Sequence, residues 1–206
     1  KIIGDNTNKY CQAYFSYDSK KSGGFTCSHL RFGYEPIRST YLVTTPNFVA
    51  CHVQAYLHMY DVTRGLQKNG TFLLNTVWDG EQLANNLPNR VKKYFADNNI
   101  TVYYINATKI AMEIGLGNRT NTILQSAFFR ITEVLPVDLA VEQMKAFIVK
   151  SYGRKGEDIV NKNYQAVDRG GEYKQLTVDP AWSNLAVENS VEDDAPEFVR
   201  NLVRPI

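Results

Sequence analysis

Three short apolar runs constrain the fold of this chain more than any other feature. They cover residues 48–53, 71–75 and 101–105, and each is short enough for a strand buried on both faces. Segments with helical patterns separate them, such as the amphipathic stretch 88–98. Strands that alternate with helices in this way predict a mostly parallel sheet between helical layers.

The remaining elements are predicted from the same patterns. Ahead of the first run we expect strands at 1–4, 25–32 and 38–43 and a helix at 9–20, and after it helices at 54–60 and 61–68. Beyond the sheet, helices are expected at 107–114, 119–134, 138–151 and 156–168. This helical last third should pack on one face or edge of the sheet.

The character of the sequence changes after about Gly170. Residues 179–182 read as a break in regular structure, acidic residues crowd 188–197, and apolar side chains at 198–203 have no obvious local partner. We therefore expect one α/β domain at residues 1–178 and an interdomain linker at 179–206 leading to a further domain. The chain opens without Met on a predicted strand, so it reads as a piece of a larger protein.

Composition narrows the classes of function. The net charge is only +2, from 23 basic and 21 acidic residues, which does not favour a nucleic-acid binder. The three cysteines, Cys11, Cys27 and Cys51, do not form a disulfide framework and suit a reducing, cytoplasmic setting. No apolar stretch approaches the roughly 20 residues that a membrane helix needs.

One candidate anion site is the turn at residues 4–8. A strand followed by a polar turn and a helix would direct backbone N–H groups and a helix dipole at a phosphate, with Gly4, Asn6 and Asn8 as contacts. Only one glycine is present, so a direct backbone contact with a pyrophosphate is not expected. The alternative is an ordinary turn capped by Asn or Asp.

Two further segments have the composition of anion sites. Ser28, Arg31, Arg38 and Ser39 flank a Gly/Pro turn, and arginine forks suit phosphates. The alternative is a pair of surface arginines near a hairpin.

The run GLGNRTN at 115–121 opens a predicted helix, where Asn118, Arg119 and Asn121 could contact an anion. The alternative there is a simple helix cap.

No residues form a recognisable catalytic or metal-binding set. His29, His52 and His58 lack metal-ligand spacing, and no C-x-x-C is present. There is also no G-x-S-x-G elbow and no P-loop lysine. We therefore predict neither catalytic nor metal-ligating residues in this chain.

Long, ordered runs along the whole chain resemble the gamma-type domain of pyruvate:ferredoxin (flavodoxin) oxidoreductases. They are KIIGDNT (1–7), AYF (13–15), SKKSGG (19–24), SHLRFG (28–33), PIRSTY (36–41), GTFLLN (70–75), EIGLGNR (113–119), QSAFF (125–129), NYQAVD (163–168) and DAPEFV (194–199). The resemblance implies a Rossmann-like, three-layer α/β domain with a mostly parallel sheet and extra C-terminal helices. In that family the domain contributes to the coenzyme A site, and the resemblance extends this role to the ten candidate residues above.

The same resemblance implies what lies elsewhere in the parent enzyme. Such enzymes convert pyruvate and coenzyme A to acetyl-CoA and CO2, and use thiamine diphosphate, Mg²⁺ and [4Fe-4S] clusters. They pass electrons to ferredoxin or flavodoxin, and a homodimeric parent is expected. This chain has neither the thiamine motif nor the ferredoxin-type cysteine run. We therefore expect no turnover by the chain alone.

Two other functions remain open on the sequence. The chain could be a free-standing Rossmann-like nucleotide-binding module, or a spacer that only holds the thiamine and cluster domains together. The abrupt ends and the apolar tail favour a domain of a larger enzyme over a free-standing module.

Overall fold

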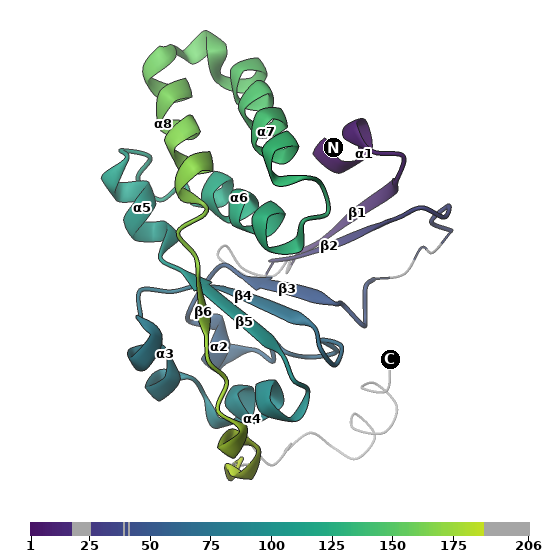
Figure 1. Ribbon diagram of the computed structural model, residues 1–206, viewed down its shortest axis with the longest axis vertical. Coiled ribbons are helices and arrows are strands. Elements are labelled where there is room, and N and C mark those ends of the chain that lie inside the picture. The colour runs from purple at the N-terminus through teal and green to yellow at the C-terminus, as the bar shows by residue number, and fades with distance from the viewer. Residues whose placement is uncertain (18–25, 39, 41, 188–206) are drawn as a thin grey trace.

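The centre of the fold is a four-stranded sheet, shown in Figure 1. The computed structural model describes residues 1–17, 26–38, 40 and 42–187. Strands β3 (Phe48–Cys51), β4 (Thr71–Asn75) and β5 (Thr101–Ile105) are parallel neighbours, and β6 (Lys174–Leu176) pairs antiparallel with β5. The three apolar runs and the mostly parallel sheet are confirmed, whereas β6 was not predicted.

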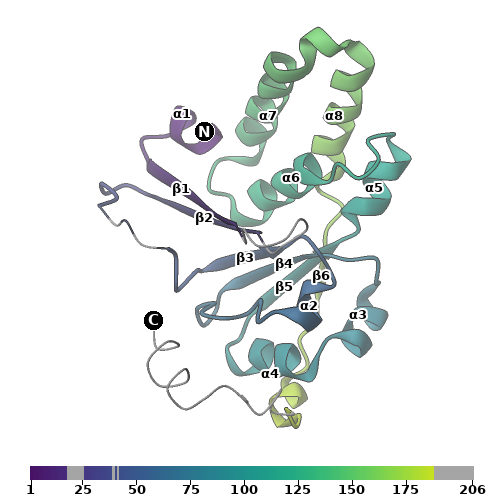
Figure 2. The same cartoon turned by 180° about the vertical axis from the view of Figure 1, so that it is seen from behind.

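Helices cover both faces of this sheet (Figure 2). Helices α2 (Tyr56–Met59), α3 (Gly80–Asn86) and α4 (Asn89–Asp97) lie on one face, and α5 (Ala107–Glu113) and α6 (Asn121–Thr132) on the other. Side chains of β4 alternate between the layers: Phe72 packs on Phe95 of α4, with ring centroids 5.1 Å apart, while Leu73 packs with Ile123 of α6. The predicted three-layer arrangement is confirmed.

The extra C-terminal helices pack beyond α6. Helices α7 (Val137–Tyr152) and α8 (Glu157–Arg169) are joined by the short 3-10 helix η1 (Gly153–Lys155). Phe129 of α6, Ile148 of α7 and Val167 of α8 share one buried cluster. The buried Ser126 hydroxyl donates to the Val167 carbonyl at 2.5 Å, which ties α6 to α8. Within the described residues, no helix is both long and apolar enough to cross a membrane.

The chain after β6 continues as folded structure. A break was expected at residues 179–182, but η2 (Pro180–Asn184) is a 3-10 helix capped by the Asp179 side chain. Trp182 packs into the cluster that α4 shares, and Lys93 of α4 donates to the Ser183 carbonyl. Residues 188–206, which include the expected acidic linker and apolar cluster, lie outside the described residues.

The N-terminal predictions are wrong for the first two elements. Residues Ile2–Asn6 form helix α1 instead of a strand, and Tyr10–Tyr17 form strand β1 instead of a helix. Strand β1 pairs antiparallel with β2 (Thr26–Gly33), from Tyr10 opposite Gly33 to Tyr17 opposite Thr26. Aromatic side chains favour strands, and cross-strand pairing outweighed the helical spacing of the tyrosines. The β1–β2 hairpin forms a sheet of its own.

Two predicted elements in the middle of the chain also differ. Described residues of 38–43 have no regular structure, and 61–68 form turns instead of a helix. In contrast, α3 was not predicted, although Asp79 and Gln82 form a capping box at its start.

Candidate functional site

The first predicted anion site, at residues 4–8, required a strand followed by a turn and a helix, and the structure does not have this order. Gly4 and Asn6 lie in α1, and Asn8 lies in the turn that follows, so the order is helix–turn–strand. The Asn6 side chain donates to the Ile2 carbonyl at 2.8 Å, within its own helix. No helix starts at this turn, so no helix N-terminus faces an anion there.

The second predicted site is divided between two faces of β2. Successive strand side chains point to opposite faces, so Ser28 and Arg31 do not converge. The Arg31 guanidinium donates to the Gln12 side chain at 3.2 Å and to the Leu42 carbonyl at 2.8 Å. Arg38 is exposed in the loop after β2, and Ser39 lies outside the described residues.

The third site is the loop between α5 and α6, residues 115–121, and it brings its predicted residues together. Gly115 and Gly117 have φ of +76° and +60°, a left-handed conformation that suits glycine. A Cβ on Gly117 would meet nothing within 4 Å, so the backbone is open to close approach. Asn118, Arg119 and Asn121 follow at once, and all three are exposed.

The start of α6 leaves its backbone donors available. Thr120 is the N-cap, but its side chain makes no capping hydrogen bond. Among the described residues, no acceptor is recorded for the N–H groups of Asn121, Thr122 and Ile123. The simple helix cap considered from the sequence is therefore not formed by Thr120. This helix end combines free N–H groups with a positive dipole end and an arginine, which suits a phosphate.

Charges around this loop are arranged in pairs. The Lys162 side chain lies against Gly115, 3.2 Å from where a Cβ would stand, and its Nζ is 2.6 Å from Asp158. Arg169, the last residue of α8, contacts Glu172 at 2.6 Å and Glu113, at the end of α5, at 2.8 Å. These contacts raise the pKa of Arg169, and its hydrogen bond lowers the pKa of Glu172. Within the described residues, the Arg119 guanidinium has no such recorded partner.

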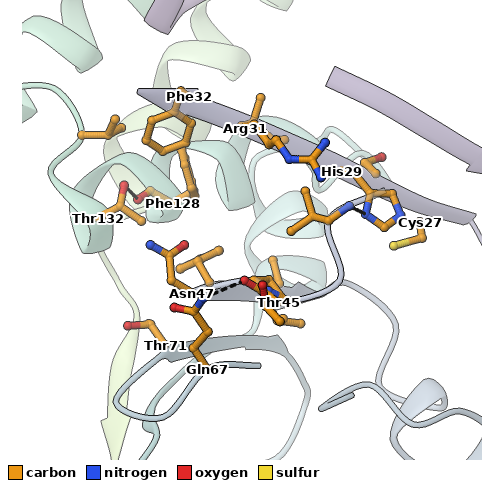
Figure 3. Close-up of a pocket in the computed structure, with 18 of the residues that line it drawn as sticks. Cys27, His29, Arg31, Phe32, Thr45, Asn47, Gln67, Thr71, Phe128 and Thr132 are labelled. Atoms are coloured by element: carbon orange, nitrogen blue, oxygen red, sulfur yellow. Dashed lines mark hydrogen bonds between the residues drawn. The ribbon is translucent and has the colours of Figure 1, made fainter. Parts of the chain in front are cut away.

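A second concave feature is a large groove between the hairpin and the sheet (Figure 3). It has a volume of about 1590 Å³ and lies between β2, β3 and the C-terminal end of α6. Polar side chains that line it include Thr45, Asn47, Gln67, Thr71 and Thr132. Sequence reasoning missed these residues because they come from separate segments and share no motif.

The groove and the α5–α6 loop are separate sites. Phe128 and Thr132, near one end of α6, line the groove, whereas Asn121 starts the other end. At 1.5 Å per residue, the helix separates Asn121 from Thr132 by about 16 Å. Of the predicted site residues, Ser28 and Arg31 line the groove, while Asn118, Arg119 and Asn121 gather at the loop.

The cysteines and the histidine beside the groove are not poised for nucleophilic or metal chemistry. Burial raises the pKa of Cys51 to about 11 and also raises that of Cys27. Desolvation lowers the pKa of His52. Within the described ranges, no group of three or more His, Cys, Asp or Glu could hold a metal ion.

Comparison with known proteins identifies the family. The family model for pyruvate ferredoxin/flavodoxin oxidoreductase matches residues 2–173. The chain is 46% identical over 208 residues to the pyruvate:ferredoxin oxidoreductase of Moorella thermoacetica, and 46% identical over 207 residues to the pyruvate-flavodoxin oxidoreductase of Enterobacter agglomerans. All of this chain is covered in both, but only 18% of each relative.

Solved structures show the same fold. A pyruvate oxidoreductase subunit from Thermotoga maritima superposes with a TM-score of 0.65 at 23% identity, covering 84% of this chain and 85% of that one. The 2-oxoglutarate:ferredoxin oxidoreductase from Magnetococcus marinus, solved with 2-oxoglutarate, coenzyme A and succinyl-CoA bound, gives 0.56 at 14% identity, covering 92% and 29%. The sequence matches and this shared fold agree that the chain belongs to the pyruvate ferredoxin/flavodoxin oxidoreductase family.

Proposed function

We propose that this chain is the coenzyme A-contacting domain of a pyruvate:ferredoxin or pyruvate:flavodoxin oxidoreductase. The parent would convert pyruvate and coenzyme A to acetyl-CoA and CO2, and pass two electrons to its iron–sulfur or flavin partner. The observation that carries this proposal is the 46% identity, along the whole chain, to enzymes named pyruvate:ferredoxin and pyruvate-flavodoxin oxidoreductase.

The α5–α6 loop is the best candidate in this chain for holding a phosphate of coenzyme A. Arg119 is exposed, the start of α6 offers unpaired N–H groups, and Gly117 permits close approach. Asn118 and Asn121 stand on either side of Arg119 and can add hydrogen bonds. Arg38 is the second candidate, because it is also exposed and has no recorded partner among the described residues.

The other candidate residues have weaker support. Arg31 is already bonded to Gln12 and Leu42, and Ser28 faces away from it. Gly4, Asn6 and Asn8 surround the end of α1 rather than the start of a helix. Any contact from these residues would have to reach a part of the ligand away from the α5–α6 loop.

The remaining chemistry belongs to other parts of the proposed parent. Within the described residues no metal-ligand cluster exists, and the sequence has no run of cluster cysteines. Thiamine diphosphate with its Mg²⁺, the [4Fe-4S] clusters and the docking site for ferredoxin or flavodoxin are therefore assigned to the rest of a cytoplasmic, homodimeric enzyme.

The test is Arg119→Ala in the full-length enzyme. A charge-assisted hydrogen bond to a phosphate contributes about 1.5–3 kcal/mol, so the KM for coenzyme A should rise roughly 10- to 100-fold. The KM for pyruvate should stay unchanged. Arg154→Ala, which removes an exposed arginine from η1, is the matched control and should leave both constants unchanged.

Arg38→Ala is measured alongside. If neither Arg119→Ala nor Arg38→Ala alters the KM for coenzyme A, the coenzyme A assignment fails. The spacer function is then the better description of this domain.

A further inference from the structure

Strand β3 is an edge strand of the main sheet, and it lines the groove. The sheet order is β3-β4-β5-β6, so β3 has a neighbour on one side only. Strand β2 lies beside it in Figures 1 and 2 and lines the same groove, but belongs to a different sheet. Parallel sheets are normally covered on both faces, and an open strand edge is a template for pairing with another strand.

The outer edge of β3 presents unpaired backbone groups. The Thr71 N–H donates to the Asn47 carbonyl at 3.0 Å, and Phe48 stands opposite Thr71 in the ladder. In a parallel pair, alternate residues bond to the same neighbour, so Asn47 and Val49 face β4. The N–H and C=O groups of Phe48 and Ala50 consequently point to the groove, and no partner for them is recorded among the described residues.

Helix α6 and the turn segment 61–68 lie on the two sides of this edge and form the two walls of a slot. On one side, Phe48 packs against Phe128 of α6, with ring centroids 5.2 Å apart, and Ile131 lies on the same wall. On the other side, Val49 joins the cluster that contains Val62. Side chains of an added strand would alternate between these two apolar walls.

We propose that an extended, apolar segment of the parent polypeptide, from outside these 206 residues, occupies this groove as a further strand beside β3. The backbone of Phe48 and Ala50 would bond to it, and the α6 and Val62 walls would bury its side chains. An edge strand beside a groove is the arrangement that strand addition uses. The slot calls for apolar residues on both faces of the added strand, as in buried parallel sheets.

The length of the relatives supports this choice of occupant. The whole chain aligns with the matched oxidoreductases but covers only 18% of their length, so most of such a polypeptide lies outside the given sequence. A segment of the same polypeptide is always present at high effective concentration. The inference therefore rests on the proposal that this chain is a domain of such an enzyme, but not on its coenzyme A site.

Amide hydrogen exchange in the full-length enzyme tests the pairing. The amides of Phe48 and Ala50 should exchange as slowly as those of β4, about 100-fold or more below the rate of an unpaired amide. Exchange of these two amides at the rate of an open edge would overturn the proposal. Protection that disappears on dilution would also overturn it, since it would assign the groove to a second copy.

Replacing Ala50 with proline tests independently whether the Ala50 N–H is hydrogen-bonded to an added strand. Proline is tolerated on a free edge strand whose N–H faces solvent, but not where that N–H is paired. Ala50→Pro should therefore lower the thermal midpoint of the full-length enzyme and speed exchange throughout β3, whereas Ala50→Val, which keeps the N–H, should not. An unchanged midpoint and unchanged exchange in Ala50→Pro would contradict the added strand. If Ala50→Pro does not fold, the exchange measurement on the unmodified enzyme decides alone.

Photo-crosslinking identifies the occupant. Thr45→p-benzoylphenylalanine places a reactive group at the exposed side of the groove. In the full-length enzyme, the linked peptide should come from outside residues 1–206 and run at the size of a single chain. A link to residues 188–206, or to a second copy, would refute this occupant. These readouts do not involve coenzyme A, so failure of the Arg119→Ala test leaves them unaffected.

Discussion

At the scale of single residues, Cys51 shows how position in the sheet sets the chemistry of a side chain. It ends β3 and is 5% exposed, and its Sγ donates to the Val53 carbonyl at 3.3 Å. Burial disfavours the thiolate and raises the pKa of the thiol from 9.0 to about 11. At neutral pH the side chain is a thiol and acts as a small apolar group.

We predict that thiol reagents distinguish the cysteines at pH 8. Cys11 is exposed and should react first, Cys27 should react more slowly because burial raises its pKa, and Cys51 should react only on unfolding. A titration with and without denaturant measures this, and Cys11→Ser should remove the fast phase. Rapid labelling of Cys51 in the native protein would contradict the burial of this side chain.

The raised pKa of Cys51 also predicts a pH dependence of stability. Between pH 9 and 11 the unfolded thiol loses its proton while the folded one keeps it, so the unfolded state binds fewer protons. The contribution of this group is complete below pH 9 and is lost as the pH rises toward about 11. Cys51→Ser, which does not titrate in this range, is expected to flatten the decline.

The sequence predicts which residue types could bind a phosphate, but it does not predict whether another residue already occupies their hydrogen-bonding groups. Arg31 and Arg119 were equally good phosphate ligands on composition. The structure binds Arg31 to Gln12 and Leu42, residues 19 and 11 positions away, and leaves Arg119 exposed. A local pattern contains no information on such distant partners, and the groove was missed for the same reason.

At the scale of elements, helix α3 is started by a reciprocal pair of hydrogen bonds. The Asp79 side chain accepts from the Gln82 N–H at 2.9 Å, and the Gln82 side chain accepts from the Asp79 N–H at 3.4 Å. We predict that Asp79→Ala lowers the free energy of unfolding by about 1 kcal/mol. Glu81→Ala, in the same turn but outside the box, is the control and should have a much smaller effect in urea denaturation. Equal losses in both variants would show that the capping box contributes nothing of its own.

Element types were predictable where periodicity and burial agreed. The strands at 71–75 and 101–105 and the helix at 88–98 meet both conditions, because each is flanked by the elements that bury it. The first 17 residues do not meet them. Tyr10, Tyr14 and Phe15 are about half exposed in β1. Their helix-like spacing in the sequence therefore does not correspond to a buried face. The pairing with β2, which lies beyond residue 25, decides the strand.

At the scale of the whole molecule, the domain presents several apolar surfaces that it does not bury itself. On the β1–β2 hairpin, Tyr14, Phe15 and Leu30 are 57%, 54% and 45% exposed. Tyr14 lies on one face of the hairpin, and Phe15 and Leu30 lie on the other. The open edge of β3 lies beside the same hairpin. Exposed apolar groups that gather on one element are typical of surfaces that contact other protein. This side of the molecule is therefore where contacts with the rest of the proposed enzyme are expected.

The last prediction concerns the 206-residue chain on its own. Its described part offers coenzyme A one compact anion site, at Arg119 and the start of α6. One or two charge-assisted hydrogen bonds give about 1.5–6 kcal/mol, no more than the order of the cost of association, so binding should be millimolar or weaker by calorimetry. With pyruvate, thiamine diphosphate, Mg²⁺ and coenzyme A supplied, no reduction of a viologen acceptor is expected, because the described residues hold no metal-ligand set and the sequence no cluster motif. The full-length enzyme under the same conditions is the positive control. Measurable turnover by the chain alone, or micromolar affinity for coenzyme A, would show that the site is complete within this domain.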